Sequence, residues 1–477
     1  MTTRLLRTVR QHWLLVLFLF VGVLLRIVVE IAYRPALLYI DSFRYLKDLG
    51  VFFPGNINPI GYEVLLLGPV LLIGDLGLVA IVQHLLGLAL ALSSYALLMR
   101  FGCRRWLAAL AVAPVLLDAY QLQIEHLIMS DLLFQVLLLL VVILLTWWGT
   151  PGPRLALLGG LLLGGSVLVR LVGLTLVVPA AVFVLLAAGL RPRDGWRRRL
   201  GSALALVAGF VFMLSAYAGY HMYWTGYPAL GGSTGSVVFG RTAMVADCER
   251  LELTPAQRAV CPEAPVAERK RMGIDYYMHF FHNEVDAGEL PEEVSYSEAQ
   301  HSLAFKVLRN QPFEVFAGIA KDFAKGFAPM RTLSPGDVPL ARWQFQTEYP
   351  LYTHEWVTRD WLEYYDQGSY SVNERAAGFL RAYQLGGGYT PGTVLGLALV
   401  LTVAAMLGVG RARRSGLRAV CLLSGGLGTA VLFTAAAMEF SWRYQLPALV
   451  LLPLAGALGI TAITGRRIDT KGSATNR

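Results

Sequence analysis

The stretch "WLLVLFLFVGVLLRIVVEIAY", residues 13–33, decides the class of this protein. A helix needs about 20 predominantly apolar residues to cross the hydrocarbon core of a bilayer, and this run is long enough. The basic residues before it resemble the start of a signal peptide, but the apolar part is too long and no small-residue cleavage site follows it. We therefore predict that residues 13–33 form a retained first membrane helix.

The composition of the whole chain extends this prediction to a polytopic protein. Of the 477 residues, 56% are hydrophobic and 15% are charged, whereas a soluble domain has about 25% charged residues. A membrane β-barrel would instead show short segments of alternating hydrophobicity. We predict an all-α polytopic membrane protein with about ten transmembrane helices. Their expected positions are 13–33, 76–99, 106–118, 130–148, 155–169, 171–190, 200–223, 391–410, 419–437 and 446–463.

The basic residues predict the orientation of these helices. The net charge is +9, and about half of the Lys and Arg residues fall in short segments on one side of the predicted helices. These segments include the N-terminus, "RPRDGWRRR" at 191–199, "RARRSGLR" at 411–418 and the C-terminal tail. By the positive-inside rule, both termini are cytoplasmic at the plasma membrane. The positive charge is thus mainly a topology signal, with contacts to anionic membrane lipids as a second role, and no nucleic-acid partner is expected.

A polar segment separates the first seven predicted helices from the last three. We expect an N-terminal membrane module at 1–224 with its first external loop at 34–75, a mostly helical extracytoplasmic domain at 225–390, and the last helices with a cytoplasmic tail at 391–477. Within the polar segment, the spacing of apolar residues over 302–330 predicts helices with a break at Pro312. No internal repeat is visible, so an inverted-repeat transporter has no support.

The four cysteines agree with this topology. Cys248 and Cys261 close a short loop in the polar segment. Outside the cytoplasm such a pair favours a disulfide, and the alternative is two free thiols. Cys103 and Cys421 fall at predicted cytoplasmic ends of helices, where thiols stay reduced. No spacing of Cys and His indicates a zinc site.

Four polar clusters, far apart in sequence, fall on the predicted outer face of the membrane. The first follows the first helix in "LLYIDSFRYLKDLGVFFPGNINPIGYEVLLL", residues 37–67. In chain order, the clusters contain Asp41, Arg44 and Tyr45; Glu125, His126 and Asp131; Arg170; and Glu439, Arg443 and Tyr444. Arg170 stands between two apolar runs, 155–169 and 171–190, and this pattern suggests a cavity lined by polar groups.

These side chains suit an anionic substrate that is linked to a lipid. Arginine can bind a phosphate through two parallel hydrogen bonds, and a carboxylate can accept the proton of an attacking hydroxyl group. The alternative for Asp41 and Arg443 is that they only anchor helix ends at the membrane surface. For His126 two roles are possible: it binds phosphate or a metal ion, or it only caps a helix.

Several polar residues in or next to the first two predicted helices favour structural roles. Glu30 lies one helical turn from both Arg26 and Arg34, so we expect these three side chains to pair with one another. His84, which follows Gln83 in the second predicted helix, is expected to make a buried polar contact.

The order of these segments resembles the C-type glycosyltransferase membrane fold (GT-C). The resemblance rests on "DSFRYLKDL", "NINPIGYEVLLLGPVL", "IEHLIMSDLLFQVLLLL", "GGLLLGGSVLVRLVGLTLVVPA" and "RYQLPALVLLPL" in this order. It covers residues 10–215 well and 391–465 more loosely. The chain is most similar to the group of protein O-mannosyltransferases, aminoarabinose transferases and RgtA-like enzymes, which use polyprenyl-phosphate sugars.

The resemblance implies roles for the outer-face residues. The acidic residue of the family's first external loop falls on Asp41, as catalytic carboxylate and general base, and the second external acidic position falls on Glu125 or Asp131. The basic residues that hold the lipid-linked phosphate fall on Arg170 and Arg443. The further candidates for substrate binding are Arg44, Tyr45, His126, Asp131, Glu439 and Tyr444. Some members use a divalent cation, Mg²⁺ or Mn²⁺, and others none, so no metal ligand or cofactor is assigned.

The chain departs from the family pattern at three places. Asp41 is followed by Ser42 rather than by a second acidic residue, and the usual His/Tyr-Pro-Pro pattern is replaced by Asn58-Pro59-Ile60-Gly61-Tyr62. The amphipathic stretch from Asn58 to Leu72 is still expected to lie along the membrane surface, where the donor would enter. The polar segment lies between the seventh and eighth predicted helices rather than at the C-terminus.

The predicted function is transfer of a sugar from a polyprenyl-phosphate donor to an extracytoplasmic glycan, lipid or protein. A flippase or transporter for lipid-linked saccharides is the main alternative, but it predicts charged groups in the core of several helices, and the core runs here are almost purely Leu, Val, Ala and Gly. A non-catalytic scaffold of the cell envelope would explain the polar segment but not the outer-face charges.

Overall fold

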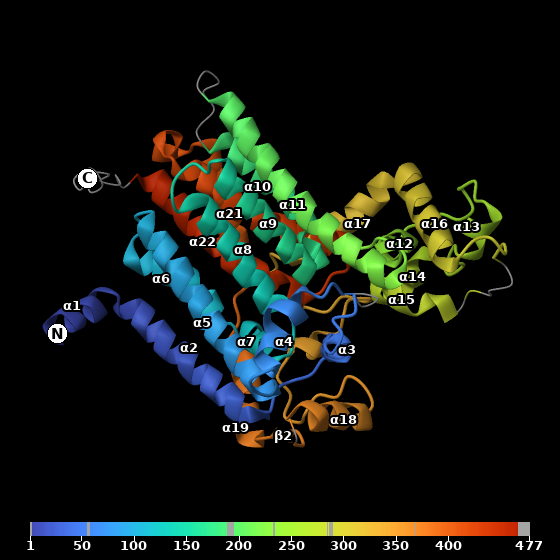
Figure 1. The fold of residues 1–477 in the computed structure, drawn as a ribbon, viewed down its shortest axis with the longest axis horizontal. Helices are drawn as coiled ribbons and strands as arrows, with labels where there is room; N and C mark the ends of the chain where they lie inside the picture. Colours follow the sequence, from blue (N-terminus) through green and yellow to red (C-terminus); the bar gives the residue numbers. More distant parts are fainter. Residues whose placement is uncertain are drawn as a thin grey trace.

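Helices dominate the computed structural model, which describes residues 2–54, 58–187, 195–231, 234–283, 285, 290–366 and 368–465 (Figure 1). Up to residue 225 the elements are α1 (Thr2–Gln11), α2 (Trp13–Ala32), β1 (Tyr33–Arg34), α3 (Ile40–Asp48), the π-helix η1 (Glu63–Leu67), α4 (Gly68–Leu71), α5 (Leu76–Arg100), α6 (Arg105–Leu117), α7 (Ala119–His126), α8 (Asp131–Thr146), α9 (Pro153–Val169), the 3₁₀-helix η2 (Leu171–Leu176), α10 (Val177–Leu186) and α11 (Trp196–Thr225). The predicted cytoplasmic tail at 466–477 and part of the basic run at 191–199 lie outside the described residues.

The polar segment is also built of helices. Its elements are α12 (Thr234–Ala243), α13 (Pro255–Ala259), α14 (Val266–Met272), α15 (Ile274–His279), η3 (Phe281–Asn283), α16 (Tyr296–Asn310), α17 (Pro312–Lys325), η5 (Leu340–Trp343), α18 (Glu355–Asp366), β2 (Ser371–Val372) and α19 (Glu374–Leu385). The chain ends with α20 (Gly392–Leu407), η6 (Gly410–Arg414), α21 (Leu417–Met438), η7 (Trp442–Gln445) and α22 (Leu446–Thr464). The predicted break at Pro312 is confirmed, because α16 ends at Asn310 and α17 begins at the proline.

The apolar helices make the chain a multi-pass membrane protein. Among the described residues, five helices are long and apolar enough to cross a membrane: α2, α5, α11, α21 and the Trp442–Thr464 helix that joins η7 to α22. α6 and α7 make a sixth span if they count as one, broken by a bend of 50°. Four shorter apolar helices, Asp131–Thr146, Pro153–Val169, Leu171–Leu186 and Gly392–Leu407, lie at other predicted positions. The total of about ten spans and their orientation stay predictions.

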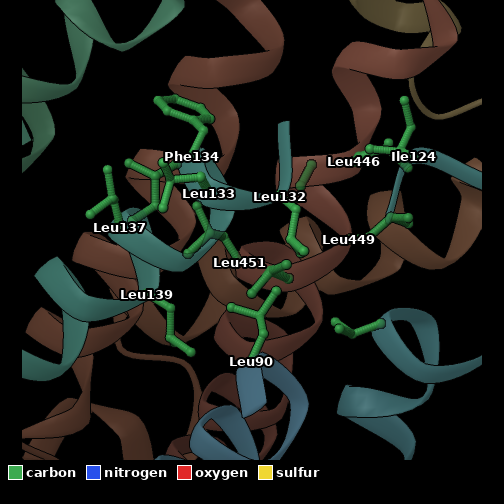
Figure 2. Close-up of a cluster of buried hydrophobic side chains, with 14 of the residues drawn as sticks. Leu90, Ile124, Leu132, Leu133, Phe134, Leu137, Leu139, Leu446, Leu449 and Leu451 are labelled. Carbon is green, nitrogen blue, oxygen red and sulfur yellow. The ribbon is translucent and has the colours of Figure 1, made fainter. Parts of the chain in front are cut away.

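The last helix lies at the centre of the bundle. Within its candidate span 89% of the residues are buried inside the protein, against 28% for α2. α22 packs against α20, α21, α6 and α8, and Figure 2 shows Leu449 and Leu451 of α22 among apolar side chains of α5, α7 and α8. This packing places η7, at the start of α22, directly above the core of the bundle.

Small residues bring α9 and α11 into close contact. A Cβ atom at Gly160 of α9 would collide with the carbonyl oxygen of Leu206, and one at Gly209 of α11 would collide with that of Leu157. Small residues at such positions let two membrane helices approach along their backbones. The contact fixes the position of α9, whose last residue precedes Arg170.

The polar segment divides between two hydrophobic cores. One core contains Phe239, Tyr277, Leu303 and Val307 and belongs to α12–α17, which lie together beyond the end of α11 in Figure 1. The second half of the segment, including Trp343 and Leu380, belongs to the core of the membrane helices. β2 also pairs antiparallel with β1, at the end of α2, in the register Tyr33 with Val372 and Arg34 with Ser371. Residues 340–385 are therefore packed onto the membrane module.

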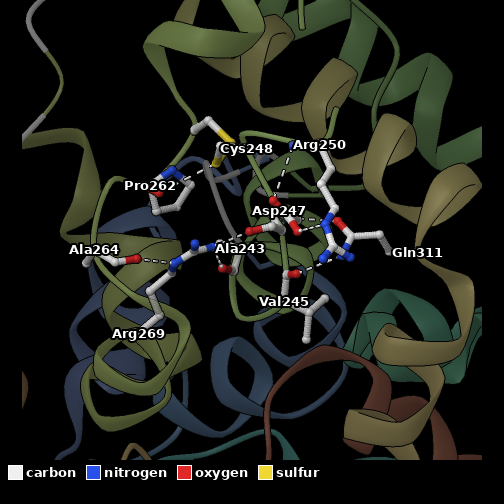
Figure 3. The surroundings of a disulfide bond; sticks show 11 residues. Ala243, Val245, Asp247, Cys248, Arg250, Pro262, Ala264, Arg269 and Gln311 are labelled. Carbon is white, nitrogen blue, oxygen red and sulfur yellow. Dashed lines mark hydrogen bonds and ion pairs between the residues drawn. A yellow bond between two sulfur atoms is a disulfide. The ribbon is translucent and has the colours of Figure 1, made fainter. Parts of the chain in front are cut away.

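The predicted disulfide between Cys248 and Cys261 is confirmed. Their Cα atoms lie 6.1 Å apart and the bond closes a loop with a sequence separation of 13 (Figure 3). The buried Arg269 crosses beneath this loop and donates hydrogen bonds to the carbonyl oxygens of Ala243, Ala246 and Ala264. Cys103 and Cys421 are free and buried.

We expect loss of this disulfide to destabilise the α12–α17 core by about 3 kcal/mol, because the bond limits the freedom of the unfolded loop. The measurement is resistance of the purified protein to limited proteolysis between residues 234 and 325, with and without reductant. Reductant should weaken the wild type and leave the double variant Cys248→Ser/Cys261→Ser unaffected. Equal protection of the wild type and the double variant would contradict the prediction.

Candidate functional site

The loop after α2 places Asp41 in the first turn of α3. A carboxylate is favoured there because unpaired backbone N–H groups point out of a helix N-terminus. Ser42 fixes this turn: its Oγ accepts a hydrogen bond from the Tyr39 N–H at 2.8 Å and donates one to the Ile128 carbonyl oxygen at 2.8 Å. The helix start is thus tied to the segment between α7 and α8.

Breaks between helices place the two predicted phosphate-binding arginines. Arg170 has an extended backbone between the end of α9 and the start of η2, so its side chain leaves the helix axis. Arg443 lies in η7, between the end of α21 and the start of α22. Both side chains are nearly buried, with exposed fractions of 9% and 8%.

Asp41, Asp131, Arg170 and Arg443 form one ion-pair network at this level. Arg443 donates from Nη1 to Asp41 Oδ2 at 3.0 Å and from Nε to Asp131 Oδ1 at 3.2 Å. Arg170 Nη1 lies 2.5 Å from the second oxygen of Asp131. The more exposed Arg44 donates to the other oxygen of Asp41, Oδ1, at 3.0 Å. Three of the four predicted polar clusters and Asp131 of the remaining cluster therefore meet through direct ion pairs.

Aromatic side chains surround the two buried arginines. The guanidinium of Arg443 lies 5.4 Å from the ring centre of Tyr444 and 5.3 Å from that of Trp343, and Arg170 lies 5.3 Å from Tyr444. Tyr45 contacts Ser130, with 3.0 Å between the hydroxyl oxygens. Such rings favour a cation electrostatically and exclude water from the ion pairs.

A cavity of about 490 Å³ opens over this network. Its charged lining consists of Asp41, Arg44, Arg170, Asp275, Arg342, Glu439 and Arg443, with His279 beside them. Tyr45 and Tyr444 line it as well, as predicted residues, together with Asn58 and Ser130. Because four arginines face three carboxyl groups, the cavity favours an anionic ligand.

The carboxyl groups of the cavity titrate differently. Burial alone would raise the pKa of Asp41, but Arg443 and Arg44 outweigh it and hold this pKa below its ordinary value. Burial raises the pKa of Glu439 to about 8; the neighbouring Asp275 adds to this rise, and Arg443 opposes it. The Oε1 atom of Glu439 is buried without a hydrogen-bond partner among the described residues. Near neutral pH, Asp41 is therefore ionised and Glu439 mostly protonated.

Glu125 and His126 lie outside the cavity lining. Glu125 is fully buried and accepts two hydrogen bonds from Arg26, each at 2.8 Å, and one from Gln121 at 3.2 Å. The expected pairing of Arg26 with Glu30 is wrong, because the guanidinium reaches across to α7 instead of along its own helix. His84 makes the expected buried polar contact, at 3.0 Å from Glu125 Oε2.

Several lining residues were not predicted. Asp275 and His279 come from α15, and Arg342 and Trp343 from η5, all within the polar segment. The aromatic run "IDYYMHFFHNEV" marks α15 in the sequence, but it carries no signal that this helix folds back over the membrane module. Trp343 is buried with its ring centre 5.3 Å from the Arg443 guanidinium, and it could be found only from the tertiary packing.

The surroundings of Asp41 do not fit a divalent cation. Each of its carboxylate oxygens accepts a hydrogen bond from an arginine, and positive charge at both sides opposes a metal ion. Within the described part of the chain, the group of His, Cys, Asp and Glu whose ligand atoms converge is elsewhere, at Glu30, His84 and His126. No catalytic step is therefore assigned to a metal at Asp41.

Replacement of Arg443 by Met should reduce the stability of the protein strongly. It would leave the buried Asp131 with Arg170 as its remaining ion-pair partner, and Asp41, with 14% of its side chain exposed, with the more exposed Arg44. Breaking a buried pair costs about 3–5 kcal/mol. The matched control is Arg44→Met, which removes a side chain that is 38% exposed and should cost about 1 kcal/mol or less. Thermal unfolding in detergent measures both, and equal shifts would contradict the network.

The comparisons with known proteins include a distant likeness. No family model and no curated protein matches the chain. Among solved structures, it is similar to the crystal structure of ArnT from Cupriavidus metallidurans in the apo state, with 14% sequence identity and a TM-score of 0.32. The match covers 93% of this chain and 77% of that chain. At this TM-score the assignment of function depends on the geometry of the cavity.

Proposed function

We propose that the protein is an integral-membrane glycosyltransferase that moves a sugar from a polyprenyl-phosphate donor to an acceptor outside the cytoplasm. The observation that carries this proposal is the cavity in which Arg170 and Arg443 lie beside Asp41, above the bundle of membrane helices. A lipid-linked phosphate needs an anion site that is open toward the bilayer, and an acceptor needs access from the aqueous side. The cavity is lined by residues of the membrane helices on one side and of the polar segment on the other. It could therefore receive a lipid-linked donor from the first side and an acceptor from the second.

The arginines are proposed to hold the donor phosphate. Arg170 and Arg443 are held by ion pairs and aromatic rings, and Arg342 donates a hydrogen bond to the Tyr39 hydroxyl, so these side chains lose little rotamer freedom when they bind a ligand. Glu439, protonated near neutral pH, adds a hydrogen-bond donor for a phosphate oxygen or a sugar hydroxyl. Charge-assisted hydrogen bonds of this kind are about twice as strong as neutral ones.

Asp41 is proposed as the general base. The acceptor oxygen forms a bond to the anomeric carbon, the bond from this carbon to the phosphate oxygen breaks, and polyprenyl phosphate leaves with the electron pair. The proton of the acceptor hydroxyl passes to an oxygen of Asp41. A phosphate that binds Arg443 competes with Asp41 for this guanidinium, which leaves the carboxylate freer to accept the proton. A single displacement of this kind inverts the anomeric configuration.

Glu125 is a weaker candidate for the second catalytic carboxylate than the sequence suggested. Its oxygens are occupied by Arg26, Gln121 and His84, and it does not line the cavity. Asp131, the other candidate, does not line the cavity and forms ion pairs with both Arg170 and Arg443. We assign Asp131 a positioning role and Glu125 a role in the packing of α2, α5 and α7.

Replacement of Asp41 by Asn should lower sugar transfer by at least about 100-fold, because the amide cannot accept the proton. The measurement is turnover of a panel of radiolabelled polyprenyl-phosphate sugars by purified protein in nanodiscs. Asp360→Asn is the matched control, since Asp360 is exposed on α18 away from the cavity lining. Near-normal turnover by the Asp41→Asn variant would remove Asp41 as the base.

The same assay separates the other functions. If the wild type binds a lipid donor but consumes none, transbilayer movement of that lipid is the next measurement, and movement would support a flippase. If it neither binds nor consumes any donor, a scaffold role gains support.

Transfer should decline above about pH 8 as Glu439 loses its proton. Its raised pKa means that the carboxyl is neutral below this pH and negative above it, where it would repel the donor phosphate. The expected effect is a rise in the KM for the donor with little change in kcat. The Glu439→Gln variant keeps a neutral side chain and should lack this rise, as measured by KM from pH 6 to 9. An identical rise in the variant would assign the alkaline effect to another group.

A further inference from the structure

A second cluster of polar groups lies inside the membrane helices, apart from the cavity. Glu30 of α2, His84 of α5 and His126 of α7 bring one ligand atom each to a common point. His84 Nε2 lies 3.2 Å from His126 Nδ1, and Glu30 Oε1 lies 3.7 Å and 3.8 Å from these two nitrogens. None of the three residues lines the cavity over Asp41.

The hydrogen bonds of the two histidines fix where their protons are. His84 Nδ1 lies 3.0 Å from Glu125 Oε2, and a carboxylate oxygen only accepts, so this nitrogen donates. His126 Nε2 lies 2.9 Å from the carbonyl oxygen of Tyr33, so it also donates. A neutral imidazole has a single N–H group. The other two nitrogens, His84 Nε2 and His126 Nδ1, therefore face each other with lone pairs.

The third group places a carboxyl oxygen at the same point. Glu30 Oε1 is buried and has no hydrogen-bond partner among the described residues. Two lone pairs and a carboxylate oxygen at this distance repel one another unless a proton or a metal ion lies between them. We propose that Glu30, His84 and His126 bind a divalent transition-metal ion, with Zn²⁺ the best match to this set of ligands.

The two nitrogens fit zinc, and Glu30 Oε1, at 3.7 Å and 3.8 Å from them, would have to move inward to bind it. Tetrahedral Zn²⁺ with bonds of about 2.0–2.1 Å has its ligand atoms about 3.3 Å apart, close to the separation of the two nitrogens. In metal sites the second nitrogen of each histidine usually donates to a carboxylate or a backbone carbonyl, and both occur here, at Glu125 and Tyr33. The side chain of Glu30 is 28% exposed, which gives an ion a route to the site and leaves a fourth position for water.

The site would hold the base of the catalytic loop in place. The carbonyl oxygen of His126 accepts a hydrogen bond from the Leu37 N–H at 3.1 Å, and the Ile128 N–H donates to the Leu37 carbonyl oxygen at 3.1 Å. Leu37 lies four residues before Asp41. A metal ion that joins α2, α5 and α7 would thus fix the segment from which α3 begins. This role does not depend on the identity of the reaction.

The test is the metal content of the purified full-length protein. The protein in nanodiscs is loaded with Zn²⁺, freed of unbound ion and analysed by mass spectrometry for metals. We expect about one Zn²⁺ per chain in the wild type and less than a tenth of that in Glu30→Gln and His126→Gln. The matched control is His221→Gln, a buried histidine on α11 with hydrogen bonds to Thr225 and Tyr227, which should keep the metal.

A measurement on the wild type covers the case in which the variants fail to fold. Loading with Co²⁺ should give the intense visible absorption of a four-coordinate ion with nitrogen and oxygen ligands, and Zn²⁺ should abolish it. A wild-type protein that holds no Zn²⁺ and gives no Co²⁺ spectrum would overturn the proposal, since a shared proton would then fill the site. Loss of the metal from His221→Gln to the same extent would overturn it too.

Discussion

The ion pairs of Arg443 are the interaction on which the site depends. One guanidinium bonds both Asp41, from the loop after the first membrane helix, and Asp131, from the start of α8. Buried charges are stable only when paired, because the desolvation free energy of a lone ion is not offset by any partner. The need to neutralise these groups draws together the ends of helices that are remote in sequence. The aromatic rings of Trp343 and Tyr444 then shield the pairs from solvent.

Three further arginines inside the protein follow the same principle. Arg26 and Glu125 neutralise each other between α2 and α7, and Arg241 pairs with Asp322 between α12 and α17. Arg331 stacks 3.6 Å from the ring centre of Tyr120 and lies 3.6 Å from Asp118. Each of these arginines connects segments that the hydropathy of the chain would leave independent. The polar groups thus define how the apolar helices are arranged, and the apolar helices supply most of the buried surface.

The sequence predicts the helices and part of the site for clear physical reasons. Apolar runs and Pro312 mark helix bounds to within a few residues, and the polar residues at the ends of these runs include most of the charged groups that line the cavity. Pairings between distant segments are beyond such patterns. Arg26 was expected to pair within its own helix, because nothing in the sequence shows that Glu125 lies closer than Glu30. The cluster of Glu30, His84 and His126 was missed for the same reason, since its members are spread over about a hundred residues with no ligand spacing.

The packing of residues 340–385 has a consequence for how such proteins can diversify. Tyr349 and Tyr365 donate hydrogen bonds to the carbonyl oxygens of Ala36 and Leu46, and Arg342 bonds Tyr39, so this part of the polar segment is built into the loop that carries Asp41. The α12–α17 core carries its own disulfide, and it reaches the cavity through Asp275 and His279 of α15 and contacts α21 through α12 and α17. Exchange of α12–α17 between homologous chains would keep the wall that η5 forms and would change the wall that α15 forms with Asp275 and His279. A graft of the whole polar segment would replace η5 as well and cut through that wall.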